Sequence, residues 1–278
     1  MFGVTILFNE VFIVRSGSSE VEVYNSDTFN FVRCNEVNGL AQPWDLEACH
    51  INRCVYIADL DSPGWIHRVD LNGTMTRWKV NDEPYGLSVN ANHNILVTCR
   101  EARKLKELTS QGDLVREVLL PEEMVHPIHA VGCRRFIVCH GDKSDPINRV
   151  CSVNSAGKVM SSYGGPPGSG VGQLSCPQRV FVDDEGYVFV ANRGNRTIYL
   201  LSWMLSDIRE LVPGRSFNRT SGPWRFCLDT RKDRLLTTDL SNSEVLVFKV
   251  KCEQERNYLS HNCNNVDRVH FYKPNIRI

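Results

Sequence analysis

Residues 164–201 read GGPPGSGVGQLSCPQRVFVDDEGYVFVANRGNRTIYLL, and this stretch decides the fold. Glycine, proline and asparagine cluster at the breaks, while β-branched and aromatic residues fill the runs between them, which predicts three short strands at 179–183, 187–191 and 197–201. The first two are joined by a tight hairpin turn in which Gly186 can adopt the positive φ that the turn requires. A unit this small has too little core to fold alone, so further copies are expected.

The same frame recurs along the chain: a proline, two further residues, an apolar strand, a turn and a second apolar strand. It begins at Pro43, Pro84, Pro127, Pro177 and Pro223, and the amino terminus fits it with Gly3 in the place of Gly86. Six repeats of about 45 residues, each with about four short strands, predict an all-β, six-bladed β-propeller of four-stranded antiparallel blades. The repeats are predicted near 1–42, 43–83, 84–126, 127–176, 177–222 and 223–250.

The sixth repeat has three clear strands and no evident fourth. Residues 251–278 form a polar tail except for the short run 269–272, Val-His-Phe-Tyr. An unpaired outer strand invites aggregation, so we expect this run to return and complete the last blade.

The segment 164–201 resembles an NHL repeat, and residues 2–250 resemble the six-bladed NHL domain of tripartite-motif (TRIM-NHL) proteins. The fourth repeat departs from the pattern, with Cys139-His140-Gly where an Asp or Asn is usual. The resemblance implies a recognition domain whose loop-bearing face binds a protein partner or single-stranded RNA. In a longer protein with a RING or B-box domain, it would be the substrate-reading part of a ubiquitin-ligase-type protein.

Composition narrows the classes of function. Lys plus Arg and Asp plus Glu each total 32, so the global charge favours no class of partner. No run approaches the roughly 18 apolar residues of a membrane span, and no signal peptide is visible at the amino terminus, so we expect a cytoplasmic protein without membrane attachment. Three Asn-x-Thr sequons keep an extracellular location as the alternative: Asn72, Asn195 and Asn218.

The eleven cysteines contain no Cys-x-x-Cys pair, which argues against a zinc finger. Most lie inside predicted strands, where a free thiol behaves as a small core residue. Disulfides between Cys49 and Cys54, across a hairpin, and between Cys252 and Cys263, in the tail, are the alternative.

In a propeller, the loop before the first strand of each blade and the loop between its second and third strands open on one face, which we call the loop face. Residues at the entry to the first strands, among them Asp45, His129, Arg179 and Arg225, are expected to ring the mouth of the central channel. Arginines of the fifth and sixth repeats map there, and guanidinium groups with aromatic rings suit RNA or protein recognition. Acidic residues of the second repeat, Asp45, Asp59 and Asp61, are expected on the opposite side. The candidate binding residues are Arg179, Arg193, Arg196, Arg225, Trp224, Arg100, Arg103, His129 and Trp44.

Each of these candidates has a structural alternative. The arginines can pair with local carboxylates and remain solvated, and Trp44, Tyr85 and Trp224, which share the position after the repeat proline, can seal one blade against the next. His129, with His126 and His140, raises the possibility of a metal site, but three converging ligands are not evident.

We therefore predict a non-enzymatic recognition domain for a protein partner or single-stranded RNA, with no catalytic residue, metal ligand or cofactor. The alternative is a lyase or hydrolase with a divalent ion in the central channel.

Overall fold

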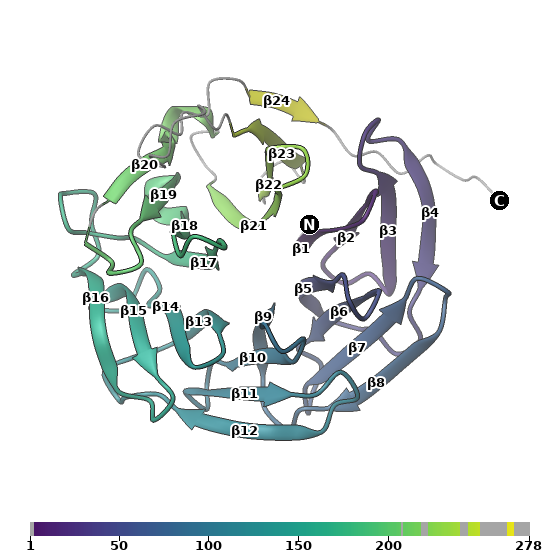
Figure 1. Cartoon of the computed structure of the whole chain (residues 1–278), viewed down its shortest axis with the longest axis horizontal. Helices are drawn as coiled ribbons and strands as arrows, with labels where there is room; N and C mark the ends of the chain where they lie inside the picture. The colour runs from purple at the N-terminus through teal and green to yellow at the C-terminus, as the bar shows by residue number, and fades with distance from the viewer. Residues whose placement is uncertain (1–2, 207, 218–221, 240–243, 251–265, 270–278) are drawn as a thin grey trace.

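The computed structural model describes residues 3–206, 208–217, 222–239, 244–250 and 266–269. Figure 1 shows a ring of six sheets around a central axis, which confirms the all-β, six-bladed propeller. The first strand of every blade lies innermost: β1 (Gly3–Leu7), β5 (Pro43–Cys49), β9 (Pro84–Val89), β13 (Pro127–Gly132), β17 (Pro177–Val182) and β21 (Pro223–Asp229).

Each blade is an antiparallel meander in which consecutive strands pair. The second and third strands are β2 (Glu10–Val14) and β3 (Glu20–Asn25), β6 (Cys54–Asp59) and β7 (Trp65–Asp70), β10 (Ile95–Cys99) and β11 (Lys104–Leu108), β14 (Arg135–His140) and β15 (Asn148–Asn154), β18 (Val188–Asn192) and β19 (Thr197–Leu201), and β22 (Arg234–Asp239) and β23 (Glu244–Lys249). The outer strands are β4 (Phe31–Glu36), β8 (Met75–Lys79), β12 (Leu114–Leu119), β16 (Val159–Gly165), β20 (Ile208–Val212) and β24 (Val266–Val269). Two 3-10 turns are present among the described residues: η1 (Arg193–Asn195) lies between β18 and β19, and η2 (Gly214–Ser216) lies between β20 and β21.

The hairpin between β17 and β18 forms as the sequence predicts. Gly186 has φ of +88°, and its amide donates to the carbonyl of Asp183 at 3.0 Å. A side chain with a Cβ is strained at such a φ, so this turn requires glycine.

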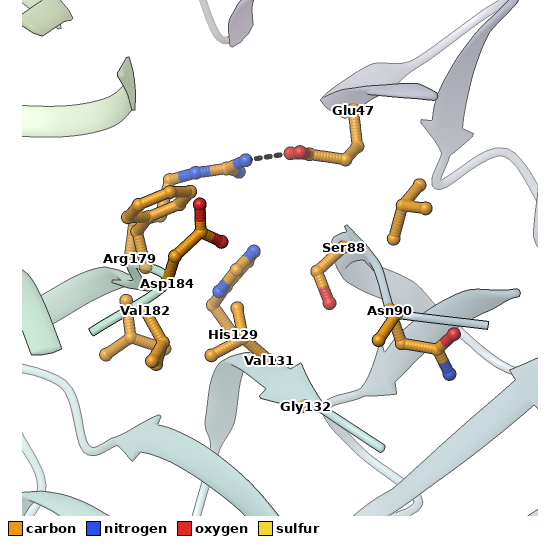
Figure 2. Close-up of a pocket in the computed structure, with 13 residues that line it drawn as sticks. Glu47, Ser88, Asn90, His129, Val131, Gly132, Arg179, Val182 and Asp184 are labelled. Atoms are coloured by element: carbon orange, nitrogen blue, oxygen red, sulfur yellow. Dashed lines mark hydrogen bonds and ion pairs between the residues drawn. The ribbon is translucent and has the colours of Figure 1, made fainter. Parts of the chain in front are cut away.

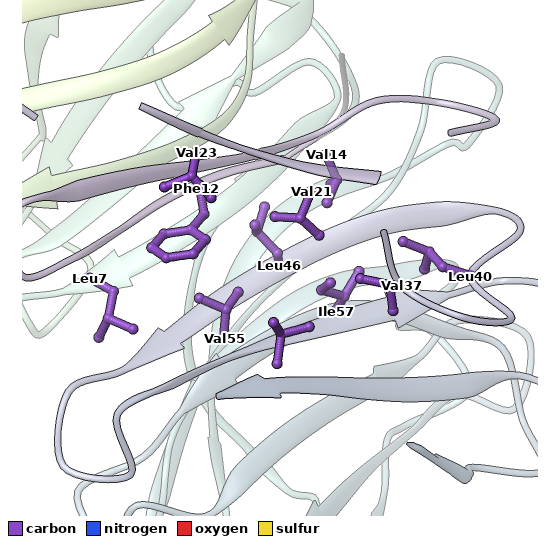
Figure 3. Packing of buried hydrophobic residues seen from close by; sticks show 11 residues of the cluster. Leu7, Phe12, Val14, Val21, Val23, Val37, Leu40, Leu46, Val55 and Ile57 are labelled. Atoms are coloured by element: carbon purple, nitrogen blue, oxygen red, sulfur yellow. The ribbon is translucent and has the colours of Figure 1, made fainter. Parts of the chain in front are cut away.

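The hydrophobic core is divided into six buried clusters, one at each interface between neighbouring blades in the part of the chain that the structure describes. Figure 3 shows the interface of blades 1 and 2, where Phe12 and Val23 face Leu46 and Val55. The alternation of side chains along a strand gives each blade two apolar faces, and each face is buried against the next blade.

The ring closes between blades 6 and 1. There, Val4 and Ile13 of blade 1 pack with Leu236 and Val247 of blade 6. Hydrogen bonds reinforce the closure, since a guanidinium nitrogen of Arg234 donates to the carbonyl of Ser26 at 2.8 Å. The first and last blades are therefore joined by the same kind of interface as the others.

The last blade has three contiguous strands, β21 to β23, as the sequence predicts. β24 pairs antiparallel with β23 from the tail, with Val245 opposite Val269 and Phe248 opposite Val266. Among the described residues, the pairing segment overlaps the predicted run 269–272 at Val269, and residues 270–272 lie outside the described residues.

The thiols of Cys49 and Cys54 lie opposite each other in the register of β5 and β6, and both are buried and free. The alternative of a disulfide at this hairpin is therefore not what the structure shows. Cys252, Cys263 and Asn218 lie outside the described residues. Among those described, no helix is long and apolar enough to span a bilayer.

Deleting residues 264–278 removes β24 and exposes the edge of β23. We expect the melting temperature to fall by several degrees, since a loss of about 2 kcal/mol corresponds to roughly 4–8 °C for a chain of this size. The matched control deletes only residues 270–278 and keeps β24. Equal melting temperatures for the wild type and the longer deletion, measured by circular dichroism, would refute a stabilising role for the strand.

Candidate functional site

The carboxylate of Asp45 lies at the centre of the channel and is completely buried. It belongs to β5, yet it accepts the backbone N–H of Leu87 on β9 at 2.9 Å and two contacts from Nη1 of Arg179 on β17, at 2.9 and 3.1 Å. The guanidinium of Arg225 on β21 forms a further ion pair with Asp45, with 3.1 Å between Nε and Oδ1. One carboxylate thus bonds groups from three other blades.

The charge around Asp45 is satisfied within the channel. Nη1 of Arg225 donates to the carbonyl of Gln178 at 2.9 Å, and Nη2 donates to that of Tyr85 at 3.3 Å. Burial alone would raise the pKa of the Asp45 carboxyl, but the positive charges of Arg179 and Arg225 hold it below its usual value. Asp45 is therefore ionised at neutral pH.

This network corrects the predicted binding face. Arg225 is fully buried, Arg179 is 4% exposed and His129 is 1% exposed, so none of them presents its side chain on the surface. The sequence places these residues correctly around the channel axis. However, the sequence also predicts that the acidic residues of blade 2 and the basic residues of blades 5 and 6 lie on opposite sides of an exposed face, and this prediction is wrong for Asp45, Arg179 and Arg225. The channel is narrow enough for these charges to meet and neutralise each other.

Asp59, a further acidic candidate of blade 2, also has a structural role. The buried carboxylate of Asp59 accepts the backbone N–H groups of Ala41 and Gln42 at 2.9 and 2.8 Å, and it contacts Nε2 of His67 at 3.2 Å. Burial by itself raises the pKa of Asp59, but these hydrogen bonds lower it to about 2. Its backbone contacts fix the loop that leads into β5.

The loop-face end of the channel is covered by three aromatic rings, Trp44, Tyr85 and Trp224, which we call the aromatic lid. The ring centroids of Trp44 and Tyr85 are 4.9 Å apart, and those of Trp44 and Trp224 are 5.9 Å apart with nearly perpendicular planes. The rings come from blades 2, 3 and 6. Trp44 and Tyr85 thus join two neighbouring blades, and Tyr85 also packs in the buried cluster that contains Ile128, as the structural alternative predicts. Trp224 meets them from across the channel, and Tyr85 joins the lid although it was not among the predicted binding residues.

Two arginines stack on the lid. The guanidinium carbon of Arg100 lies 4.7 Å from the centroid of Tyr85, and that of Arg193 lies 4.6 Å from the centroid of Trp224. Arg100 also contacts the carboxylate of Asp142 at 3.3 Å. Both arginines follow second strands, as predicted, and the structure brings them to the same surface as the lid.

Arg103 and Arg196 make other contacts. The guanidinium of Arg103 donates to the carbonyl of Glu122 at 3.2 Å. Arg196 adopts the left-handed conformation at the end of η1, with φ of +60°, and its amide donates to the carbonyl of Arg193 at 3.0 Å. Neither residue has a recorded contact with the three lid rings.

A cavity of about 320 Å³ opens at the other end of the channel, near the hairpin turns that join the first and second strands. We call this side the turn face. Figure 2 shows Glu47, Arg179, His129 and Asp184 around the same space, with an ion pair between Arg179 and Glu47. Sequence reasoning missed Glu47, although it lies two residues after Asp45 and therefore on the same side of β5.

The two titratable groups of this cavity have displaced pKa values. Burial raises the pKa of Glu47 to about 7, since the charge of Arg179 offsets the loss of solvation only in part. Burial, together with the charge of Arg179, lowers the pKa of His129 to about 3. At neutral pH the imidazole is therefore uncharged, and Glu47 exists in both forms.

The histidines expected near a metal do not converge. Nδ1 of His126 pairs with Asp145 at 2.8 Å, while Nε2 of His140 lies 3.6 Å from the thiol of Cys151. No group of three His, Cys, Asp or Glu side chains with metal-binding geometry occurs among the described residues. The carboxylates of the channel, Asp45 and Glu47, are paired with guanidinium groups. A site that also holds these positive charges does not fit a divalent cation.

Neither a protein-family model nor a curated protein sequence matches the chain. Solved structures of similar fold include Kuenenia stuttgartiensis hydrazine synthase, with a TM-score of 0.66 and 13% identity over 89% of this chain and 76% of that one. Virginiamycin B lyase from Staphylococcus aureus has a TM-score of 0.65 and 12% identity over 97% and 83%, respectively. A chain of the nidogen/laminin complex has a TM-score of 0.65 and 13% identity over 84% and 87%. These similarities establish a propeller fold that serves enzymes and binding proteins alike.

Replacing Asp45 by Asn removes the charge that balances Arg179 and Arg225. We expect a loss of about 3–5 kcal/mol in the free energy of unfolding, because two buried guanidinium groups lose their common partner. Asp27→Asn is the control, since Asp27 pairs with Lys232 at the surface and its loss should matter little. Urea denaturation measures both variants, and similar stabilities for the two would contradict the central role of Asp45.

Glu47 makes stability depend on pH. Its pKa rises from about 4.5 to about 7 on folding, so between these values the folded protein holds more protons than the unfolded chain. The contribution of Glu47 to stability therefore falls as pH rises through this window. We expect Glu47→Gln to gain stability relative to the wild type between pH 5 and pH 8 in urea denaturation. A constant difference between the two proteins would contradict the raised pKa.

Proposed function

We propose that this chain is a non-enzymatic recognition propeller that binds a protein partner through the aromatic lid and its two arginines. The observation that carries the proposal is the stacking of Arg100 and Arg193 on rings that three separate blades hold over the channel. Trp, Tyr and Arg are the residue types that dominate binding energy in protein interfaces. Because the rings and guanidinium groups are already packed, little side-chain entropy is lost on binding.

The same geometry favours a protein partner over single-stranded RNA. Arg100 and Arg193 already lie over the rings of Tyr85 and Trp224, which are 7% and 6% exposed, so a base finds little ring surface on which to stack. A protein partner can instead contact the two guanidinium groups that cover the rings. Arg179 and Arg225 are consumed by the channel network, and Arg100 is paired with Asp142. RNA binding depends on several accessible cations, and these pairings reduce the number available on the loop face.

The resemblance of residues 164–201 to an NHL repeat supports a more specific version of this proposal. In that version the chain is a TRIM-NHL-like recognition domain in the cytoplasm and, together with a RING domain, reads substrates for a ubiquitin-ligase-type protein. The nidogen/laminin complex is a case in which a propeller of similar fold occurs in a protein complex.

The double variant Arg100→Glu/Arg193→Glu tests the proposed surface. We expect partners captured by the wild-type propeller, quantified by mass spectrometry, to decrease at least tenfold, since reversal of two interface charges typically costs several kcal/mol. Arg33→Glu is the matched control, because Arg33 forms its ion pair with Glu10 on blade 1, away from the lid. Equal capture by the double variant and the control would refute the assignment of the binding face.

Fluorescence anisotropy with a random single-stranded RNA pool at two salt concentrations tests the competing ligand. We expect no salt-sensitive binding that depends on Arg100 and Arg193. Salt-sensitive binding that the double variant loses and the Arg33→Glu control retains would reassign the same surface to RNA.

A further inference from the structure

The turn-face cavity is lined by polar side chains that are not part of the proposed binding surface on the loop face. Arg179 and Glu47 lie along its upper side in Figure 2, and the other polar lining residues are Ser88, Asn90, His129 and Asp184. Its volume of about 320 Å³ is in the range of small-molecule sites, which are commonly mostly apolar with a few convergent polar groups.

His129 supplies an acceptor that has no partner in the protein. Its Nε2 lies 2.8 Å from the carbonyl oxygen of Leu87, and a carbonyl only accepts, so Nε2 carries the proton. Nδ1 of the neutral ring is then a lone-pair acceptor, and it is buried without a hydrogen-bond partner. The Cδ2 edge of the ring faces Gly86, where an added Cβ would lie 3.1 Å from it, so Nδ1 lies on the other edge. A buried acceptor of this kind is stabilised by a ligand that donates to it.

An apolar recess adjoins the polar part of the cavity. Val131, Gly132 and Val182 line both the channel cavity and a second cavity of about 180 Å³ between blades 4 and 5. The second cavity is completed mainly by apolar groups, among them Ile137, Val188 and the ring of Trp203, which is 56% exposed. The polar and apolar spaces therefore share one wall on the turn face.

We propose that this composite cavity binds a carboxylic acid that carries a hydroxyl or amino group on the neighbouring carbon and an apolar side group. The ligand carboxylate accepts from Arg179 and from the protonated Glu47, the hydroxyl or amino group donates to Nδ1 of His129, and the apolar group enters the recess beside Val131 and Trp203. The site lies at the other end of the channel from the aromatic lid, so it is independent of the proposed protein-binding surface.

The charges around Glu47 couple this binding to protons. The groups that face it are Asp45 on its own strand, Arg179 on β17, His129 on β13, Asp184 after β17 and the neutral thiol of Cys227 on β21. With Asp45 ionised and His129 neutral, Arg179 and Arg225 leave one positive charge beside Glu47, and ionisation of Glu47 cancels it; Asp184 is exposed to solvent and is not part of this count. A ligand carboxylate therefore favours the protonated form of Glu47, and its binding weakens as pH rises through about 7.

Isothermal titration with L-3-phenyllactate, L-phenylalanine and 3-phenylpropionate tests the proposal on the full chain. We expect phenyllactate or phenylalanine to bind at least tenfold more tightly than phenylpropionate, which lacks the donor for His129, and the two donors distinguish a hydroxyl from an amino ligand. The affinity of the wild type should fall about fivefold between pH 7 and pH 8, as the protonated fraction of Glu47 decreases.

Four variants make the test specific. Glu47→Gln should remove the fall in affinity with pH, whereas Glu10→Gln, which breaks a carboxylate–guanidinium pair on blade 1, should retain it. Val131→Trp fills the shared wall and should abolish binding while the protein remains folded by circular dichroism. Arg193→Glu should bind the probes as the wild type does, which separates this site from the loop face.

Failure of all three probes to bind the wild type would overturn the proposal. Unchanged binding by Val131→Trp, or the same pH dependence in Glu47→Gln as in the wild type, would overturn it as well.

Discussion

The buried carboxylate of Asp45 is the constraint on which the rest of the channel depends. It pairs with Arg179 and Arg225 and accepts the amide of Leu87, so strands from blades 2, 3, 5 and 6 share one charge centre. Elsewhere in the described ring, blades are held to their neighbours mainly by apolar packing, which is non-directional. The ion pairs across the channel have direction, and they set the distance between blades that are not neighbours.

This network separates the two ends of the channel. On the loop face, Trp44, Tyr85 and Trp224 close over it, and the carbonyl of Tyr85 accepts from Arg225 directly below. On the turn face, no comparable aromatic contact is recorded among the described residues, and the channel widens into the cavity lined by Glu47 and His129. One end is thus a rigid, nearly filled surface suited to a macromolecular partner, and the other is a hollow suited to a small ligand.

The arginines illustrate how the same residue type takes different roles at different depths. Arg179 and Arg225 lie on first strands and point into the channel, where their charge is neutralised by carboxylates from another blade. Arg100 and Arg193 lie in loops after second strands, and their guanidinium groups rest on aromatic rings at the surface. A guanidinium group is weakly hydrated and planar, so it suits both positions.

The sequence by itself determined the fold. The repeat spacing, the alternation of apolar residues and turn residues such as Gly186 are local signals, and they predicted six antiparallel blades and the residues that surround the channel. It also identified Asp45, His129, Arg179 and Arg225 as channel residues, because position within a repeat is itself a local property. Only the tertiary structure decided that these charges neutralise one another, that Tyr85 joins two tryptophans over the channel, and that Glu47 and His129 share a cavity. Those contacts join residues as far apart in the sequence as Asp45 and Arg225 or Trp44 and Trp224, and their distances depend on how all six blades close.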